Sequence, residues 1–345
     1  MATGTGKSKI FVDACLEALK SNPECRIALI VPTEKLRDEN WRLEFLKWAT
    51  ESVYGRIDRY CYASINKIDK TYDLIGADEI HNITEKNSSF FERNAHAHIM
   101  GLTATPPEDT IKTELLIKYC PVIYEYTLQE AVADLLVVPF NIEIVEVPLD
   151  KTDKYIDVKL KDKHFKTTEA AQYAYLDRLL LQARYTQNKK LEEFRILNRM
   201  RFLYNLKSKT TIAKKLIEKC EGKKTLIFCG TIAQAEELCP YRYHSESSNQ
   251  DYERFINGEI EHLSCVRALN EGMNIPELDA AIIVQSSSKK REIIQRIGRC
   301  VRWRENHTAK IYIVNSQGTQ DVVWTTKALE GIDKKKINYI HYKNL

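Results

Sequence analysis

Two arginines, Arg299 and Arg302, stand three residues apart in a segment whose apolar residues have helical spacing. Residues three apart lie on one face of a helix, so both guanidinium groups would point the same way. Guanidinium groups bind phosphate oxygens through paired N–H donors, and no cluster of carboxylates is close by in the sequence. With Gln295 on the same segment, they are candidates for binding a polyphosphate that another part of the molecule supplies.

A glycine-rich segment, Ala2 to Ser8, opens the chain and leads into a predicted helix over Ser8 to Leu19. Backbone N–H groups at such a turn point at phosphates, and the helix dipole adds to the attraction. Lys7 would reach the β- and γ-phosphates of ATP, and the Ser8 hydroxyl would bind Mg²⁺. The full pattern has glycine where Met1 stands, and the strand expected to feed the loop is not in this sequence. The candidate ATP-binding residues of this segment are Thr3, Gly4, Thr5, Gly6, Lys7 and Ser8.

An acidic pair, Asp78 and Glu79, follows the strand predicted over Asp73 to Ala77. One carboxylate could hold Mg²⁺ through water while the other polarises the attacking water. The alternative is an acidic cap on the next helix. The phosphate-binding segment, the acidic pair and the arginine helix occur in one chain, which indicates a single ATP-hydrolysis site that converges between two lobes.

Length and composition describe an ordinary globular protein. The 345 residues exceed the size at which a single core usually stops growing, so two domains are expected. Hydrophobic content of 43%, charged content of 29% and a net charge of +4 permit nucleic-acid binding without demonstrating it. Nine scattered cysteines without a C-x-x-C pair, no secretory signal and no apolar run of about 20 residues predict a cytoplasmic protein with reduced thiols and no membrane partner.

Strands alternate with helices in two stretches of the chain, which predicts an α/β fold of two doubly wound lobes with parallel sheets. We expect a first lobe over 1–147, a mostly helical insertion over 148–193, a second lobe over 194–317, and a C-terminal helix with a basic, solvated tail over 318–345. The strand predicted over Val137 to Val147 would close the first lobe or cross out of it. The other predicted strands cover 26–31, 60–65, 73–77, 98–102, 225–229, 264–269, 280–284 and 310–314.

The order of these segments resembles that of superfamily 2 helicases of the DEAH-box type, including DNA-repair, phage recombination and restriction-translocase members. The matching segments are Ala2 to Ser8 (motif I), Val31 to Thr33 (Ia), Asp78 to His81 (II), Thr103 to Thr105 (III), Thr225 to Gly230 (IV), Asn270 to Pro276 (V) and Gln295 to Arg302 (VI). The resemblance implies two RecA-like lobes that bind ATP and Mg²⁺ between them.

By this resemblance the hydrolysis site draws on both lobes. Asp78, with Ser8, would coordinate Mg²⁺, and Glu79 would be the general base. Arg299 and Arg302 would be arginine fingers from the second lobe, typically worth about 10³–10⁵ in rate. The remaining site residues are His81 and Gln295, which would connect the lobes, and the nucleotide-binding Gly272 and Asn274 of motif V.

The same resemblance assigns residues to nucleic acid. Thr103 and Thr105 would couple lobe closure to movement of the strand. Pro32 and Thr33 would contact the nucleic-acid backbone, which the family grips by phosphates more than by base edges.

The sequence therefore predicts nucleic-acid-dependent ATP hydrolysis that drives translocation along DNA or its unwinding, with RNA a less favoured track. Two alternatives stay open. One is a nucleic-acid-binding scaffold that does not hydrolyse ATP. The other is the motor subunit of a restriction or repair assembly, whose nuclease or repair partner would be on another chain. The sequence does not indicate the oligomeric state.

Three weaker candidates favour structural explanations. His96 and His98 form an H-x-H pair, but no third ligand with suitable spacing is near, so we do not expect a metal there. Tyr241 and Tyr243 are more typical of packing than of base stacking. The helix predicted over Leu191 to Leu203 is more typical of a packed helix with a solvated basic side than of a nucleic-acid surface.

Overall fold

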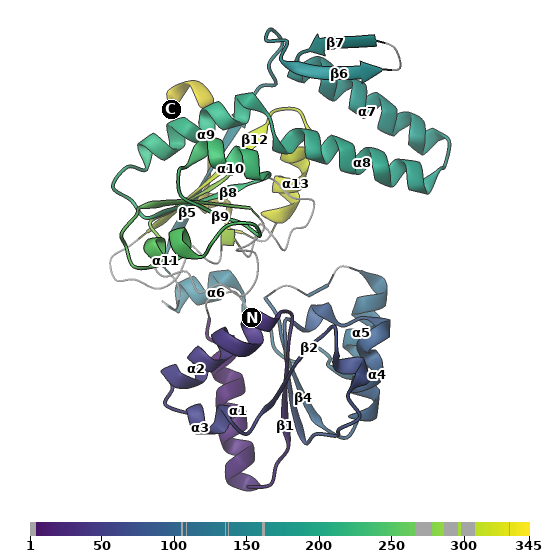
Figure 1. Ribbon diagram of the computed structural model, residues 1–345, viewed down its shortest axis with the longest axis vertical. Coiled ribbons are helices and arrows are strands. Elements are labelled where there is room, and N and C mark those ends of the chain that lie inside the picture. The colour runs from purple at the N-terminus through teal and green to yellow at the C-terminus, as the bar shows by residue number, and fades with distance from the viewer. Residues whose placement is uncertain are drawn as a thin grey trace. The chain divides into compact units, whose positions relative to one another are not determined.

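The computed structural model describes residues 5–104, 106–107, 109–134, 136, 138–160, 163–266, 278–285, 296–297, 308–330 and 332–345. These residues form two compact units, one made by the chain up to residue 136 and the other from Val138 onward (Figure 1). Within the described ranges, no helix is both long enough and apolar enough to cross a membrane.

The first unit is built on a parallel sheet of four described strands in the order β2-β1-β3-β4. The strands are β1 (Ile27–Val31), β2 (Asp58–Cys61), β3 (Leu74–Asp78) and β4 (His98–Leu102). Three of them confirm the predicted strands. The strand predicted over 60–65 instead ends at Cys61, and Ile65–Lys67 forms a 3-10 turn. No described strand precedes the first helix.

Helices cover both faces of this sheet (Figure 1). Because successive residues of a strand point to opposite faces, Ile27, Leu29 and Val31 pack on one side while Ala28 and Ile30 pack on the other. The first side is covered by α1 (Lys7–Ser21), α2 (Trp41–Lys47) and α3 (Glu51–Tyr54), and the second by α4 (Glu85–Arg93) and α5 (Thr110–Tyr119). A short helix, α6 (Leu128–Ala133), ends the unit.

The helical segment after β1 is interrupted. The Thr33 side-chain oxygen accepts a hydrogen bond from the Leu36 N–H at 3.3 Å. A π-helical turn, Leu36–Asn40, then precedes α2. Such wide turns are frequent at functional sites, and this one leads directly into Trp41, whose importance the sequence did not reveal.

The second unit contains a seven-stranded sheet in the order β13-β5-β12-β11-β8-β10-β9, with every neighbouring pair parallel. Its strands are β5 (Phe140–Val147), β8 (Thr225–Cys229), β9 (Arg242–Tyr243), β10 (His262–Val266), β11 (Ala280–Ile283), β12 (Ala309–Ser316) and β13 (Ile337–His341). The second unit also contains the helices α9 (Lys207–Lys219), α10 (Ile232–Leu238), α11 (Gln250–Ile256) and α13 (Gln320–Ala328).

The strand β5 belongs to this second sheet, which moves the boundary that the sequence placed at residue 147. β5 pairs with β12 along its whole length, from Phe140 opposite Ala309 to Val147 opposite Ser316. Its inward residues Val145 and Val147 are buried in the core of the second unit. The alternating sequence of β5 predicted a strand correctly, but alternation does not reveal which sheet a strand joins.

The C-terminal tail is docked, contrary to the prediction of a solvated end. β13 adds to the edge of the sheet beside β5, from Ile337 opposite Ile142 to His341 opposite Glu146. Ile340, Tyr342 and Leu345 pack against the core of the second unit. These three apolar side chains explain why the tail stays on the sheet despite its basic start.

The insertion predicted as mostly helical also contains an antiparallel hairpin of β6 (Ile156–Leu160) and β7 (Lys163–Thr167). Two antiparallel helices follow, α7 (Glu169–Tyr185) and α8 (Lys189–Tyr204), so the insertion extends past residue 193 (Figure 1). Glu169 is fully buried and fixes the base of the insertion. Its carboxylate accepts hydrogen bonds from the Asp150 N–H, the Tyr155 hydroxyl and the Ser208 N–H at 2.9, 2.7 and 3.0 Å.

Candidate active site

The first helix begins as a phosphate-binding segment should. Gly6 is the N-cap residue of α1 and has a left-handed backbone, with φ of 84° and ψ of 21°. Its carbonyl accepts from the Lys9 N–H at 2.9 Å, which starts the helix directly after it. Glycine adopts this conformation without the strain that a side chain would bring. Thr5, Gly6, Lys7 and Ser8 therefore lie at a helix start, a position whose N–H groups and dipole generally favour anions.

A glycine on the sheet brings this helix close to the acidic pair. A Cβ atom added to Gly76 would lie 2.3 Å from Cε2 of Phe11, so only glycine lets the Phe11 ring lie on β3. Phe11 is one turn after Lys7 on α1, and Gly76 is two residues before Asp78. Residue 76 therefore decides how closely the phosphate-binding helix approaches the end of β3.

Asp78 is the last residue of β3 and is held from two sides. The indole nitrogen of Trp41 donates to its Oδ2 at 3.0 Å, and the Tyr62 hydroxyl donates to its backbone carbonyl at 3.0 Å. Burial, and then the nearby charges of Asp78 and Glu79, raise the pKa of Tyr62 well above its ordinary value, so this phenol stays a donor. The Trp41 ring also meets Phe11 edge to face at 5.7 Å, which connects α1 to the carboxylate.

Glu79 has a left-handed backbone, with φ of 50° and ψ of 53°, which is uncommon for a residue with a side chain. Its carbonyl accepts from the Asn82 N–H at 2.9 Å and from the Asn82 side-chain nitrogen at 3.1 Å. Non-glycine residues in this region cost about 1–3 kcal/mol and persist where surrounding contacts enforce them. The turn Ile80–Asn82 supplies those contacts.

The Glu79 carboxylate meets His81 and Thr103. The Thr103 hydroxyl is 2.9 Å from His81 Nδ1 and donates to Glu79 Oε2 at 3.3 Å, while His81 Nδ1 is also 3.3 Å from Glu79 Oε2. The His81 side chain is fully buried, and 18% of the Glu79 side chain is exposed. The structure thus brings motif II and Thr103 of motif III together.

One tautomer of His81 satisfies the whole cluster. If His81 carries its proton on Nδ1, Nδ1 donates to the Thr103 oxygen and the Thr103 hydroxyl donates to Glu79. His81 Nε2 then accepts from the Asn82 side-chain nitrogen, 3.4 Å away. We assign the proton to Nδ1 on this basis, because each of these hydrogen bonds then joins a donor to an acceptor.

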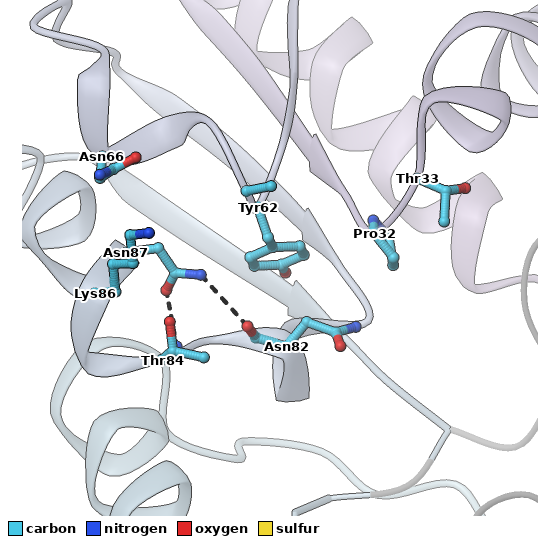
Figure 2. Close-up of a pocket in the computed structure, with 9 residues that line it drawn as sticks. Pro32, Thr33, Tyr62, Asn66, Asn82, Thr84, Lys86 and Asn87 are labelled. Atoms are coloured by element: carbon cyan, nitrogen blue, oxygen red, sulfur yellow. Dashed lines mark hydrogen bonds between the residues drawn. The ribbon is translucent and has the colours of Figure 1, made fainter.

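A hollow of about 410 Å³ lies beside the motif II turn. Its lining joins the residues after β1 and β2 to the turn and the start of α4 (Figure 2). Figure 2 shows the Asn87 side chain bonded to both Thr84 and the Asn82 backbone, with the Tyr62 ring close by. The lining residues are Pro32, Thr33, Tyr62, Ala63, Asn66, Asn82, Thr84, Lys86 and Asn87.

The oxygen donors of the first unit fit a magnesium ion. Mg²⁺ is usually held by one or two protein oxygens, with water and substrate phosphates completing its shell. A carboxylate at the end of β3, Asp78, and a hydroxyl at the start of α1, Ser8, are of this kind. The described residues contain no group of three or more metal-ligating side chains, so the H-x-H pair is not part of one.

Several predicted site residues lie outside the described ranges. Within the arginine segment the structure describes two helical residues, Arg296 and Ile297. The Arg296 guanidinium is buried, donates to the Gln285 carbonyl at 2.8 Å and lies 5.2 Å from the Phe228 ring centroid. The predicted residues outside the described ranges are Thr3, Gly4, Thr105, Gly272, Asn274, Gln295, Arg299 and Arg302.

Sequence reasoning missed Trp41, Tyr62 and Asn82. Trp41 is an apolar residue at the start of α2, and nothing in the sequence indicates its indole N–H bond. Tyr62 was placed in a strand, and Asn82 directly follows motif II without belonging to it. The signal that the sequence offered was a polar residue, Asn82, directly after motif II.

Comparison with known proteins gives the site its context. Residues 208–304 match the family described as the helicase conserved C-terminal domain. The chain is 24% identical over 356 residues to the DNA 3'-5' translocase XPB2 of Sulfurisphaera tokodaii, covering 93% of this chain and 78% of that protein. The chain is related to superfamily 2 helicases. This similarity supports an ATP-hydrolysing, nucleic-acid-dependent enzyme of the helicase or translocase class.

Solved structures agree on the fold. The chain is similar to the helicase domain of Pyrococcus furiosus Hef with a TM-score of 0.54 and 14% identity, covering 95% of this chain and 93% of that one. It is also similar to S. cerevisiae Dbp5 bound to RNA and ADP BeF3, with a TM-score of 0.62 and 11% identity, covering 100% and 85%. At these identities the likeness confirms two RecA-like lobes of parallel sheet.

Proposed function

We propose that this chain is a DNA-dependent ATPase of the DEAH-box type that moves along or unwinds DNA. The observation that carries the proposal is the cluster of Glu79, His81 and Thr103 next to Asp78, at the carboxyl ends of β3 and β4. An acid that was merely the cap of a helix would not need a buried histidine and a threonine hydroxyl on its carboxylate.

The residues of the cluster, Asp78 and the residues at the start of α1 would have distinct roles in hydrolysis. Bound Mg²⁺ neutralises phosphate charge, and Asp78 and Ser8 would hold it. Lys7 and the N–H groups at the start of α1 bind the phosphates. Glu79 accepts a proton from the attacking water, and Thr103 with His81 keeps its carboxylate oriented for that transfer.

The remaining site residues are part of the proposal. Arg299 and Arg302 would stabilise the transferred phosphoryl group, and Gln295 would connect them to His81. Motif V would contribute Gly272 and Asn274, and Thr105 would act with Thr103 in coupling. The other proposed ATP-binding residues are Thr3, Gly4, Thr5 and Gly6.

DNA is the proposed track because the similar translocase is named for DNA. Pro32 and Thr33 line the hollow and would contact the strand's phosphates. An external nuclease or repair partner remains part of the proposal. All eight described cysteines are free, which fits a reducing, cytoplasmic location.

The test is ATP hydrolysis by the 345-residue chain with no nucleic acid, single-stranded DNA, forked DNA and single-stranded RNA of matched sequence. We expect DNA to raise the turnover rate well above both the basal rate and the rate with RNA. Stimulation by RNA alone would overturn the choice of DNA. Tight DNA binding without turnover would instead support the non-hydrolysing scaffold.

A further inference from the structure

We propose that Asn82 is a positioning residue that couples nucleic acid in the hollow beside the motif II turn to the orientation of Glu79. This inference rests on the proposed function, because it assumes that Glu79 is the general base and that a nucleic-acid strand occupies the hollow. It assigns a role to a residue that lies outside the predicted motif.

Asn82 is connected to Glu79 by two routes, and the first consists of two direct hydrogen bonds. Its side-chain nitrogen donates to the Glu79 carbonyl at 3.1 Å, and its backbone N–H donates to the same oxygen at 2.9 Å. These two bonds close the turn that gives Glu79 its left-handed backbone. Alanine and aspartate at position 82 keep the backbone N–H, so these variants remove only the side-chain contribution.

The second route runs through the catalytic cluster. The Asn82 side-chain nitrogen is 3.4 Å from His81 Nε2, and His81 Nδ1 is 2.9 Å from the Thr103 hydroxyl that donates to Glu79. With the Nδ1–H tautomer, every donor in this series points from Asn82 toward the Glu79 carboxylate. An amide at position 82 therefore favours the tautomer that the cluster needs.

Asn82 is also part of the wall of the hollow, in which its neighbours are polar. Asn87 is buried, donates to the Asn82 carbonyl at 3.4 Å and accepts from the Thr84 N–H at 2.8 Å. Thr84 and Asn87 line the hollow together with Asn82 (Figure 2). A ligand that contacts this wall therefore contacts the residues that hold the motif II turn.

The occupant that fits is the backbone of a nucleic-acid strand. The wall offers the hydroxyls of Thr33 and Thr84, the Asn66 amide and the cation of Lys86, which suit a phosphodiester group, beside a larger apolar surface. A nucleic-acid strand that binds only when Asn82, Thr84 and Asn87 are in place raises the fraction of molecules in which the motif II turn is ordered. More Glu79 side chains are then oriented for proton transfer, so hydrolysis rises when the strand is bound.

The test compares Asn82→Ala with Asn66→Ala. Asn66 also lines the hollow, and Figure 2 shows it apart from the motif II turn, so this variant deletes the same amide without touching Glu79. The readouts are the ratio of DNA-stimulated to basal turnover at saturating DNA and the DNA concentration that gives half of the stimulation. Fluorescence anisotropy measures DNA binding separately.

We expect Asn82→Ala to lower the stimulation ratio about tenfold, within the range typical of coupling between sites. Asn66→Ala should keep the ratio and raise the DNA concentration for half-stimulation. The isosteric Asn82→Asp, which lacks the N–H donor, should behave like Asn82→Ala. A parental ratio in Asn82→Ala, or an equal loss of ratio in Asn82→Ala and Asn66→Ala, would overturn the inference.

Hydrogen exchange separates this inference from the proposed function. If the parent chain binds DNA but is not stimulated, the proposed function fails, and the exchange rates of the amides of residues 80–83 decide the inference. Slower exchange on DNA binding in the parent, lost in Asn82→Ala, supports the coupling role. Exchange that DNA leaves unchanged in the parent overturns it, as does a parent that binds no DNA.

Discussion

Trp41 donates its indole N–H to Oδ2 of Asp78 at 3.0 Å, although 37 positions separate the two residues. Trp41 is almost completely buried, with 2% of its surface exposed, which shields the indole side of the bond from water. Because Trp41 also packs edge to face on Phe11 of α1, one side chain fixes both the phosphate-binding helix and the carboxylate proposed to hold Mg²⁺.

Replacing Trp41 with phenylalanine should weaken magnesium use. The variant keeps an aromatic ring beside Phe11 but loses the N–H donor, so Asp78 loses its orientation. Groups that orient a metal ligand typically contribute about 10–100-fold to metal affinity or activity, so we expect the Mg²⁺ concentration for half-maximal hydrolysis to rise about tenfold.

The matched control is Trp48→Phe, since Trp48 is 40% exposed and lies near Lys9 and Lys47. That variant should keep the parental Mg²⁺ dependence. An unchanged Mg²⁺ midpoint in Trp41→Phe would show that the indole bond does not position Asp78.

The Thr103 hydroxyl should matter more than the shape of its side chain. Thr103→Val keeps the volume but removes the bridge between His81 and Glu79, and a hydrogen bond to a charged group is worth roughly 1.5–3 kcal/mol. We expect turnover with DNA to fall about tenfold or more while ATP affinity stays close to parental. Thr103→Ser restores the hydroxyl and should recover most of the rate, and a poor rate in both variants would instead point to packing.

The sequence predicted which candidate site residues of the first unit lie together better than it predicted the contacts that hold them. Lys7, Asp78, Glu79, His81 and Thr103 each belong to a short local motif, and local order along a parallel sheet brings strand ends together. The bonds that hold them come from Trp41 and Tyr62, which are distant in sequence, and from an asparagine outside the motif. A helical stripe or an apolar run predicts burial, but it does not state which polar atom the buried ring reaches.

The sequence also could not predict which sheet a strand joins. The alternating pattern of β5 predicts a strand. The lysines of the tail predict a charged end. Their positions in the second sheet depend on which neighbour they pair with, and side-chain alternation carries no information about the partner. The docking of β13 depends on three scattered apolar residues after a run of lysines, where charge dominates the local pattern.

Gly76→Ala should destabilise the first unit. The new Cβ would lie 2.3 Å from the Phe11 ring, so either α1 or β3 must shift, and overpacking of this kind typically costs about 1–3 kcal/mol. The KM for ATP should rise as well, because Phe11 is one turn from Lys7. Urea unfolding and ATP titration measure the two effects.

Gly55→Ala is the control for that substitution. Its nearest neighbour is the Ser52 carbonyl oxygen at 3.6 Å, an ordinary contact, and its φ of −63° suits alanine. We expect Gly55→Ala to unfold at a urea concentration equal to or above that of the parent. Equal stability of Gly76→Ala and the parent would contradict close packing of α1 on β3.

A buried ion pair fixes α9 to α13 in the second unit. Lys209 Nζ lies 2.9 Å from Asp321 Oδ2, and both side chains are fully buried. Lys209→Met leaves the aspartate without its cation, which typically costs about 3–5 kcal/mol. Urea unfolding should show that loss, and Lys209→Met combined with Asp321→Leu should recover part of it. A double variant less stable than Lys209→Met would contradict this account.

The central claim is that Glu79 removes the proton from the attacking water, and Glu79→Gln tests it most directly. The amide keeps the size of the side chain but cannot accept the proton as a carboxylate does. In the presence of DNA, we predict parental ATP affinity and a turnover rate lower by about 10²–10⁴. Turnover at the parental rate would contradict the assignment of Glu79 as the general base.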